Sequence, residues 1–193
     1  MFEAIRTYYK NLVPGITNED LNALEAALVV KEIKKGEYLV KEGHVCRNVS
    51  FVNYGLLRIY YQVDGKDFSI GFVSKGDYTS EYESFLTRAP AAQNIEALAD
   101  SQVVDLNYDS MQQLYKSHPV FQEFGRKIAE FLFIMLNRRN TALLVLSPEE
   151  RYRQMIENNP SLMQQVPQYM LASYIGVTPE HLSRIRRKMT DTR

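Results

Sequence analysis

Polar and charged side chains crowd one short segment near the C-terminus, from Thr178 to Lys188. With a helical period, Leu182 and Ile185 fall on one face of this segment and polar residues fall on the opposite face. An arginine there can pair with O6 and N7 of guanine, and a carboxylate can accept a hydrogen bond from N4 of cytosine. The candidate contact residues are Thr178, Glu180, His181, Ser183, Arg184, Arg186, Arg187 and Lys188.

The preceding residues predict a second, shorter helix that ends in a tight turn. The segment 170–174 carries apolar side chains at helical spacing, and the small Ala172 lets a crossing helix approach closely. Gly176 fits the left-handed position that ends a helix. Thr178 is a good N-cap and Pro179 fits the first helical position. The series predicts a helix-turn-helix whose second helix enters the major groove of DNA.

The local charge agrees with this prediction. From Gly176 to Arg193 there are five basic residues against two acidic ones, although the whole chain has a formal net charge of zero. Glu180 and Arg184 are the candidates for reading bases, whereas Ser183 and the basic residues at 186–188 are better placed for phosphates. A solvated basic helix is the simpler alternative. The ordered turn, cap and proline favour DNA binding over it.

Composition excludes several other kinds of site. Cys46 is the only cysteine among 193 residues, so an internal disulfide, a four-cysteine zinc site and a single-chain iron–sulfur cluster are excluded. We expect Cys46 to be a small buried hydrophobe. The three histidines, His44, His118 and His181, are scattered, and we expect no metal and no cofactor. An effector of unknown identity stays open.

The ends of the chain and its hydropathy bear on location. The N-terminal segment 1–10 lacks the apolar run of a signal peptide, and no stretch has the length of a membrane span. We therefore expect a cytoplasmic protein with no membrane partner.

The first half of the chain predicts helices followed by a β domain. Residues 1–28 form helices broken at Pro14-Gly15, and 29–106 alternate as short strands with glycine turns. Phe51–Val63 is expected as one long strand. Asp64-Gly65 after it is a strong hairpin signal, because both positions favour positive φ. Short strands at regular spacing predict a sandwich or a rolled barrel.

The second half is helical. A long helix is predicted at about 120–146, with a heptad-like seam. This seam can pack on the β domain, join two chains, or do both, and we expect both. Ser147 caps a further helix and marks the boundary between a sensor domain, 1–146, and a DNA-binding domain, 147–193. The seam residues are Phe121, Phe124, Ile128, Phe131 and Met135.

This arrangement resembles the Crp/Fnr superfamily of bacterial transcription regulators over nearly the whole chain. Segments 35–37, 42–43 and 55–58 look like the turns and strand of that family's roll, and 178–185 looks like its recognition helix. The resemblance implies an α+β fold: a jelly-roll-like double-stranded β-roll flanked by helices, a long dimerisation helix and a small all-α helix-turn-helix domain. It also implies a homodimer on palindromic double-stranded DNA, RNA polymerase as a partner, and no enzymatic activity.

The family's cyclic-nucleotide cassette is only half matched. Residues 76–81 fit its first part, with Ser80 in place of glycine and Glu81 at the ribose position. Ala91 stands where the phosphate arginine is expected, so a charge-assisted pair would be lost. The resemblance therefore does not predict a response to cyclic AMP. The candidate effector residues are Gly76, Ser80, Glu81, Arg88, Ala91 and Ala92.

A small-molecule binding module and a metalloenzyme are the two alternatives to a DNA-binding regulator. Another residue, with Arg88 the nearest, could replace the arginine in a cyclic-nucleotide or other small-molecule binding module. A metalloenzyme of the cupin type would need a histidine–carboxylate cluster, but the strand region contains only His44.

The β-hairpin wing that follows the recognition helix in many relatives fits no residues after Lys188, which predicts fewer phosphate contacts and strong salt sensitivity.

Overall fold

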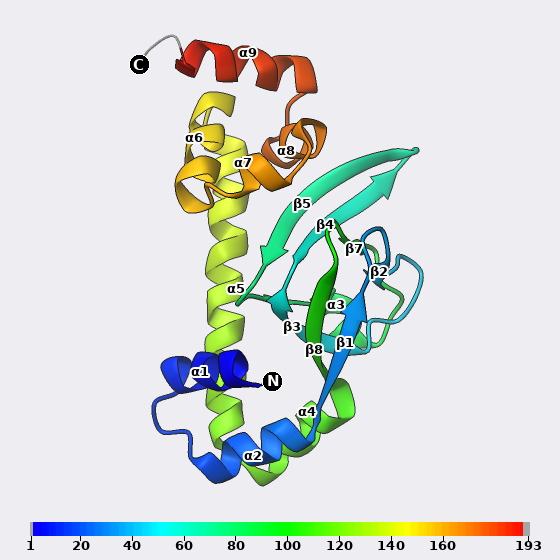
Figure 1. Cartoon of the computed structure of the whole chain (residues 1–193), viewed down its shortest axis with the longest axis vertical. Helices are drawn as coiled ribbons and strands as arrows, with labels where there is room; N and C mark the ends of the chain where they lie inside the picture. Colours follow the sequence, from blue (N-terminus) through cyan, green and yellow to red (C-terminus); the bar gives the residue numbers. More distant parts are fainter. Residues whose placement is uncertain (1, 191–193) are drawn as a thin grey trace. The chain divides into compact units, whose positions relative to one another are not determined.

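The computed structural model describes residues 2–190, in two compact units (Figure 1). One unit comprises Met1–Ile59 and Phe72–Phe131, and the other comprises Tyr60–Gly71 and Leu132–Arg193. The boundary expected at Ser147 remains a prediction. Asp191 and Arg193, which contribute to the predicted local charge, lie outside the described residues.

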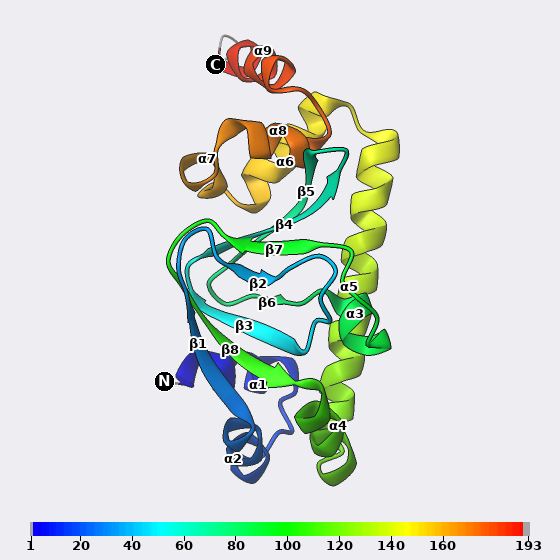
Figure 2. The same ribbon diagram turned by 90° about the vertical axis from the view of Figure 1, so that its right-hand side faces the viewer.

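Two four-stranded sheets form the β domain, as the strand pattern predicts (Figure 2). Their orders are β1-β8-β3-β6 and β2-β7-β4-β5, with β1–β8, β3–β8, β3–β6 and β2–β7 antiparallel. Leu57, Ile95 and Val103 are fully buried in the core. The strands are β1 Leu28–Ile33, β2 Tyr38–Val40, β3 Asn48–Tyr54, β4 Leu56–Val63, β5 Lys66–Ser74, β6 Tyr78–Thr79, β7 Asn94–Ala97 and β8 Ser101–Asn107.

The single strand expected from Phe51 to Val63 is wrong, because the chain breaks at Gly55. Gly55 has φ +104°, and a Cβ atom at this position would overlap the side chain and Cα of Ser101. Only glycine fits both the backbone conformation and the close approach. The Asp64-Gly65 hairpin is confirmed, with φ values of 50° and 72°.

Four helices pack against the β domain: two precede its strands, one lies between two strands and one follows the last strand. These are α1 Glu3–Leu12, α2 Asn18–Ala26, α3 Tyr82–Thr87 and α4 Tyr108–Ser117. Thr17 and Asp20 form a capping box at the start of α2. Asp20 also lies 2.8 Å from Nδ1 of His118, which ties α2 to the end of α4. Leu28, expected to end the first helices, instead begins β1, where it pairs with Leu106.

The long helix α5 spans Val120–Val145, close to its predicted range, and begins in the core of the β domain. Phe124 stacks on Tyr9 with ring centroids 3.8 Å apart. After it come α6 Pro148–Asn158, α7 Leu162–Gln165, α8 Gln168–Ile175 and α9 Pro179–Thr190. The Ser147 capping box with Pro148 starts α6 as expected. No helix among the described residues is long and apolar enough to span a membrane.

Replacing Gly55 by alanine tests the break between β3 and β4. Positive φ costs an L-residue about 1–2 kcal/mol, and overpacking adds about 1–3 kcal/mol. Gly36→Ala is the matched control, because Gly36 has φ +85° but open space around its Cα. We expect Gly55→Ala to lower the free energy of unfolding, measured in urea, clearly more than Gly36→Ala does. Equal losses would contradict the close packing against Ser101.

Candidate functional site

Helices α8 and α9 are joined by a tight turn at Gly176. This residue ends α8 in the left-handed conformation, with φ 76° and ψ 41°. The amide of Val177 donates to the carbonyl of Ala172 at 3.0 Å, which closes the turn. At the start of α9, Oγ1 of Thr178 accepts a hydrogen bond from the amide of His181 at 3.2 Å. The glycine turn and the threonine cap inferred from sequence are therefore present.

The two faces of α9 differ sharply in exposure. Leu182 and Ile185 are 0% and 2% exposed and anchor the helix to its own unit. His181 is half-buried, and Nη1 of Arg186 bonds Oε1 of Gln168 on α8 at 3.3 Å. The other predicted contact residues share an exposed position: Thr178, Glu180, Ser183, Arg184, Arg187 and Lys188.

Glu180 lies in the first turn of α9 and is suited to accept hydrogen bonds. Its own backbone amide and the Thr178 hydroxyl lower the pKa of this carboxyl, with a smaller contribution from the charge of Arg184. An ionised carboxylate is an acceptor only, so Glu180 can pair with a donor such as an exocyclic amine and not with a carbonyl.

Two arginines fix the C-terminal end of α8. Arg151 donates from Nε to the carbonyl of Ile175 at 2.8 Å and from Nη1 to that of Leu146 at 2.7 Å. Arg139 donates to the carbonyl of Tyr174 at 3.3 Å. The last carbonyls of a helix have no intrahelical partner and carry partial negative charge, so cations stabilise them. Both arginines thereby hold the turn that orients α9.

The predicted seam of α5 divides between two environments. Phe121 and Phe124 are buried in the core of the first unit, and Ile128 packs against that core. Phe131 and Met135 are 61% and 45% exposed. Further along α5, other large apolar side chains are exposed: Phe133, Ile134, Leu136, Leu143, Leu144 and Val145.

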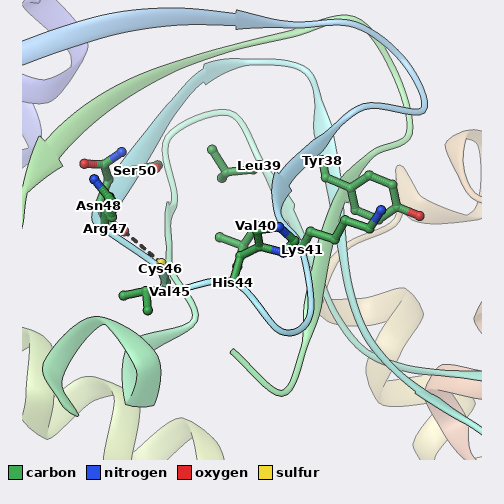
Figure 3. A pocket seen from close by; sticks show the side chains of 10 residues that line it. All are labelled: Tyr38, Leu39, Val40, Lys41, His44, Val45, Cys46, Arg47, Asn48 and Ser50. Carbon is green, nitrogen blue, oxygen red and sulfur yellow. Dashed lines mark hydrogen bonds between the residues drawn. The ribbon is translucent and has the colours of Figure 1, made fainter. Parts of the chain in front are cut away.

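A cavity of about 300 Å³ lies beside β2, the β2–β3 loop and β3 (Figure 3). Ligand pockets of small molecules begin at about this size. Its lining mixes apolar side chains with cations and small polar groups: Tyr38, Leu39, Val40, Lys41, His44, Val45, Cys46, Arg47, Asn48 and Ser50. Apart from His44 and Cys46, which were assigned no ligand role, sequence reasoning missed these residues. They all lie within residues 38–50 of the chain, but they match no sequence motif.

Some of the predicted effector residues lie next to this cavity and others do not. Oγ of Ser80 donates to the Asn48 carbonyl at 3.0 Å and contacts Sγ of Cys46 at 3.4 Å. Glu81 is buried and caps α3 by accepting from the amide of Ser84 at 2.6 Å. Ala91 is buried beside the cavity, since its amide donates to the carbonyl of the lining residue His44, whereas Gly76 lies in the β5–β6 turn and Ala92 is exposed.

The guanidinium of Arg88 already has partners within the protein. It ends α3 with φ 64°, and Nη1 donates to the carbonyls of Cys46 and Phe85, both at 3.1 Å. Its guanidinium also lies over the ring of Tyr108, 4.9 Å from the centroid. These contacts pin the β2–β3 loop to α3. A phosphate at Arg88 would have to compete with them.

A buried carboxylate lies behind the cavity wall. Asp105 accepts from Oγ of Ser50 at 2.5 Å and from Nδ2 of Asn48 at 3.1 Å, and both donors line the cavity. Burial raises the pKa of Asp105, opposed by these hydrogen bonds and by the charge of Lys31. A carboxylate so close disfavours a further anion at this wall. Among the described residues no group of histidine, cysteine and carboxylate side chains could hold a metal ion.

Comparison with known proteins agrees with this geometry. The cyclic nucleotide-binding domain family matches residues 30–118. Among curated proteins, the sequence comparison finds no significant match.

Solved structures with the same fold include several regulators. A putative transcriptional regulator of the Crp/Fnr family from Eubacterium rectale aligns with TM-score 0.72 and 16% identity over 95% of this chain and 88% of its own. FixK2 from Bradyrhizobium japonicum aligns with TM-score 0.72 and 17% identity, over 86% and 85%. The Thermus thermophilus catabolite activator protein aligns with TM-score 0.59 and 17% identity, over 94% and 87%. Residues 30–118 thus match a cyclic nucleotide-binding domain, and the chain has the fold of these solved structures.

Proposed function

We propose that this protein is a Crp/Fnr-type transcription regulator that binds double-stranded DNA through α9. The single observation that carries the proposal is the exposed polar face of α9, with Glu180, Ser183 and Arg184 in its first two turns. Recognition helices of this kind contact base edges through their N-terminal residues. The buried Leu182 and Ile185 and the two capping arginines hold this face at a fixed angle to α8.

The contact residues fall into two classes of role. Glu180 and Arg184 read bases, since a carboxylate accepts from cytosine N4 and a guanidinium donates to guanine. Four further residues contact the phosphate backbone: Ser183, Arg186, Arg187 and Lys188. His181 lies beside the base-reading residues, and Thr178 caps the helix. Phosphate contacts position the protein without specifying sequence.

The proposed active form is a homodimer joined along α5. Large apolar side chains are exposed along α5 from Phe131 to Val145, and such a patch marks an interaction surface. Phe131 and Met135 continue the heptad-like seam beyond the buried Phe121 and Phe124. Two recognition helices about 34 Å apart would read a palindromic site, and RNA polymerase is the proposed downstream partner.

The proposed effector is not cyclic AMP. Arg88 is engaged with two backbone carbonyls and Tyr108, Ala91 offers no cation, and Asp105 lies behind the cavity wall. The cavity beside β2 and β3 is the candidate site for another small molecule. The second candidate function, a cyclic-nucleotide-responsive module, is favoured by the family match over residues 30–118.

Alanine variants of two arginines test the base-reading assignment on a sequence selected from random DNA. Arg184→Ala should relax discrimination at one base pair by about 1–3 kcal/mol, because it removes a paired contact to guanine. Arg187→Ala is the matched control and should weaken all sequences about equally, lowering the salt slope by about 1. Fluorescence anisotropy at several salt concentrations measures both. If Arg184→Ala keeps the parent's sequence preference, the assignment is wrong.

Sedimentation velocity tests the α5 dimer. Phe131→Glu would bury an unpaired carboxylate in the interface, so we expect the dimer dissociation constant to rise about a hundredfold, about 2.8 kcal/mol. Asn137→Glu adds the same charge to an exposed position off the seam and should leave association nearly unchanged. A dimer equally weakened by both variants, or by neither, would count against this seam.

Thermal unfolding with cyclic AMP or cyclic GMP decides between the two effector hypotheses. A ligand at a hundred times its dissociation constant stabilises by about 2.7 kcal/mol, which raises Tm by several degrees for a chain of this size. We expect no shift at micromolar nucleotide. A clear shift that Glu81→Gln abolishes would establish the cyclic-nucleotide alternative.

A further inference from the structure

Strand β5 is an edge strand, being the last in the order β2-β7-β4-β5. The outward amides and carbonyls of an edge strand need a partner or water, and an exposed row of them invites pairing with another strand. Part of this edge is covered by side chains of the helical segment, within the same compact unit.

One hydroxyl on α8 serves two backbone groups of the β5 edge. Oγ of Ser173 accepts a hydrogen bond from the amide of Ser69 at 2.9 Å and donates to the carbonyl of Asp67 at 3.0 Å. A serine hydroxyl has one proton to donate, so this proton is fully used. Asp67 and Ser69 are two apart, as the groups on one edge of a strand must be. Ser173 thus forms the hydrogen bonds to the β5 edge that a neighbouring strand would form.

Arg139 strengthens the same contact. Its Nη2 lies 3.5 Å from the carbonyl of Ser69 and 3.3 Å from that of Tyr174, and its guanidinium stacks over the Tyr174 ring, 4.3 Å from the centroid. We name the contact of Ser173 and Arg139 with Asp67 and Ser69 the hairpin latch. It connects the hairpin to α8 and to α5 at once.

The two strands of the hairpin run from one unit into the other. Leu57 on β4 and Val73 on β5 are buried in the core of the β domain, whereas Tyr60–Gly71 belongs with the helical unit. The Asp64-Gly65 turn favours the hairpin conformation from the sequence alone. The tip also carries Asp64 beside Lys66, so it lacks the positive charge of a phosphate-binding wing.

We propose that the hairpin latch positions the DNA-binding helices, with Ser173 as the positioning residue. This proposal rests on the proposed function. The latch leaves the outward side chains of α9 exposed, so it orients the helices and does not mask them. A dimer that must meet two half-sites at fixed separation benefits from such preorganisation, whereas a single half-site makes no such demand.

The test uses the full chain with Ser173→Ala. Site-resolved hydrogen exchange should show the Ser69 amide protected in the parent and exchanging about tenfold faster in the variant, the loss expected for about one hydrogen bond. Affinity for the palindromic duplex should fall about tenfold, while affinity for a duplex with one half-site stays unchanged. Ser161→Ala is the matched control, because the Ser161 hydroxyl bonds only the nearby Asn159 side chain among the described contacts.

Ser173→Thr keeps the hydroxyl and should retain both the protection and the palindrome affinity, which guards against a general folding defect in the alanine variant. Equal loss on both duplexes would mean that Ser173 supports the fold of α8 itself, and would overturn the positioning role. An unprotected Ser69 amide in the parent would overturn the latch.

Failure of this inference and failure of the proposed function give different results. If Ser173→Ala removes the protection but palindrome affinity is unchanged, the positioning role is wrong and DNA binding stands. If the parent binds neither duplex while the Ser69 amide is protected, the latch exists but the proposed function fails.

Discussion

The stacking of Phe124 on Tyr9 fixes the start of α5, and the rest of the molecule depends on where this helix begins. Phe121 and Phe124 are buried with the tyrosines of α1 and β6, so the first two turns of α5 are part of the β-domain core. Aromatic pairs contribute beyond the area they bury, which makes this end rigid. From that anchor α5 runs for 26 residues without a break. The apolar side chains beyond Phe131 are therefore presented on an ordered scaffold.

Near the far end of α5, charged side chains hold the C-terminal end of α8. Arg151 bonds the carbonyl of Leu146, just after α5, and that of Ile175, the last residue of α8, while Arg139 bonds the carbonyl of Tyr174. Because a helix C-terminus exposes carbonyls without partners, these arginines satisfy groups that would otherwise need water. The turn at Gly176 is held from outside as well as by its own hydrogen bonds. These contacts add to the anchoring of α9 by its own buried residues, Leu182 and Ile185.

The β domain has the fold of the matched cyclic nucleotide-binding domain, but several of its polar side chains bond groups of the protein itself. Glu81 caps α3, Arg88 pins the β2–β3 loop, and Ser80 bonds Asn48. Each of these side chains forms hydrogen bonds with the backbone or with neighbouring residues of the protein. The cavity beside β2 and β3 instead offers mixed polar and apolar walls with a buried carboxylate behind them. The fold is thus similar to that of the matched solved structures, whereas the proposed ligand differs from cyclic AMP.

The sequence alone determined the local elements whose chemistry is short-range. The caps at Ser147 and Thr178, the hairpin turn at Asp64 and the end of α8 at Gly176 each depend on one residue and its nearest backbone groups. Helical periodicity likewise separated Leu182 and Ile185 from the polar face of α9. Such features need no distant partner, so they could be read from spacing.

Only the tertiary structure decided the features that join residues far apart in the chain. Gly55 breaks a strand because Ser101 packs against it, and Phe121 leaves the seam because Tyr9 lies beside it. Arg88 is occupied by the Cys46 carbonyl, and Ser173 meets β5 across more than one hundred residues. In every case the deciding partner is brought close by the packing of other elements. No local sequence pattern predicts that these residues lie close together.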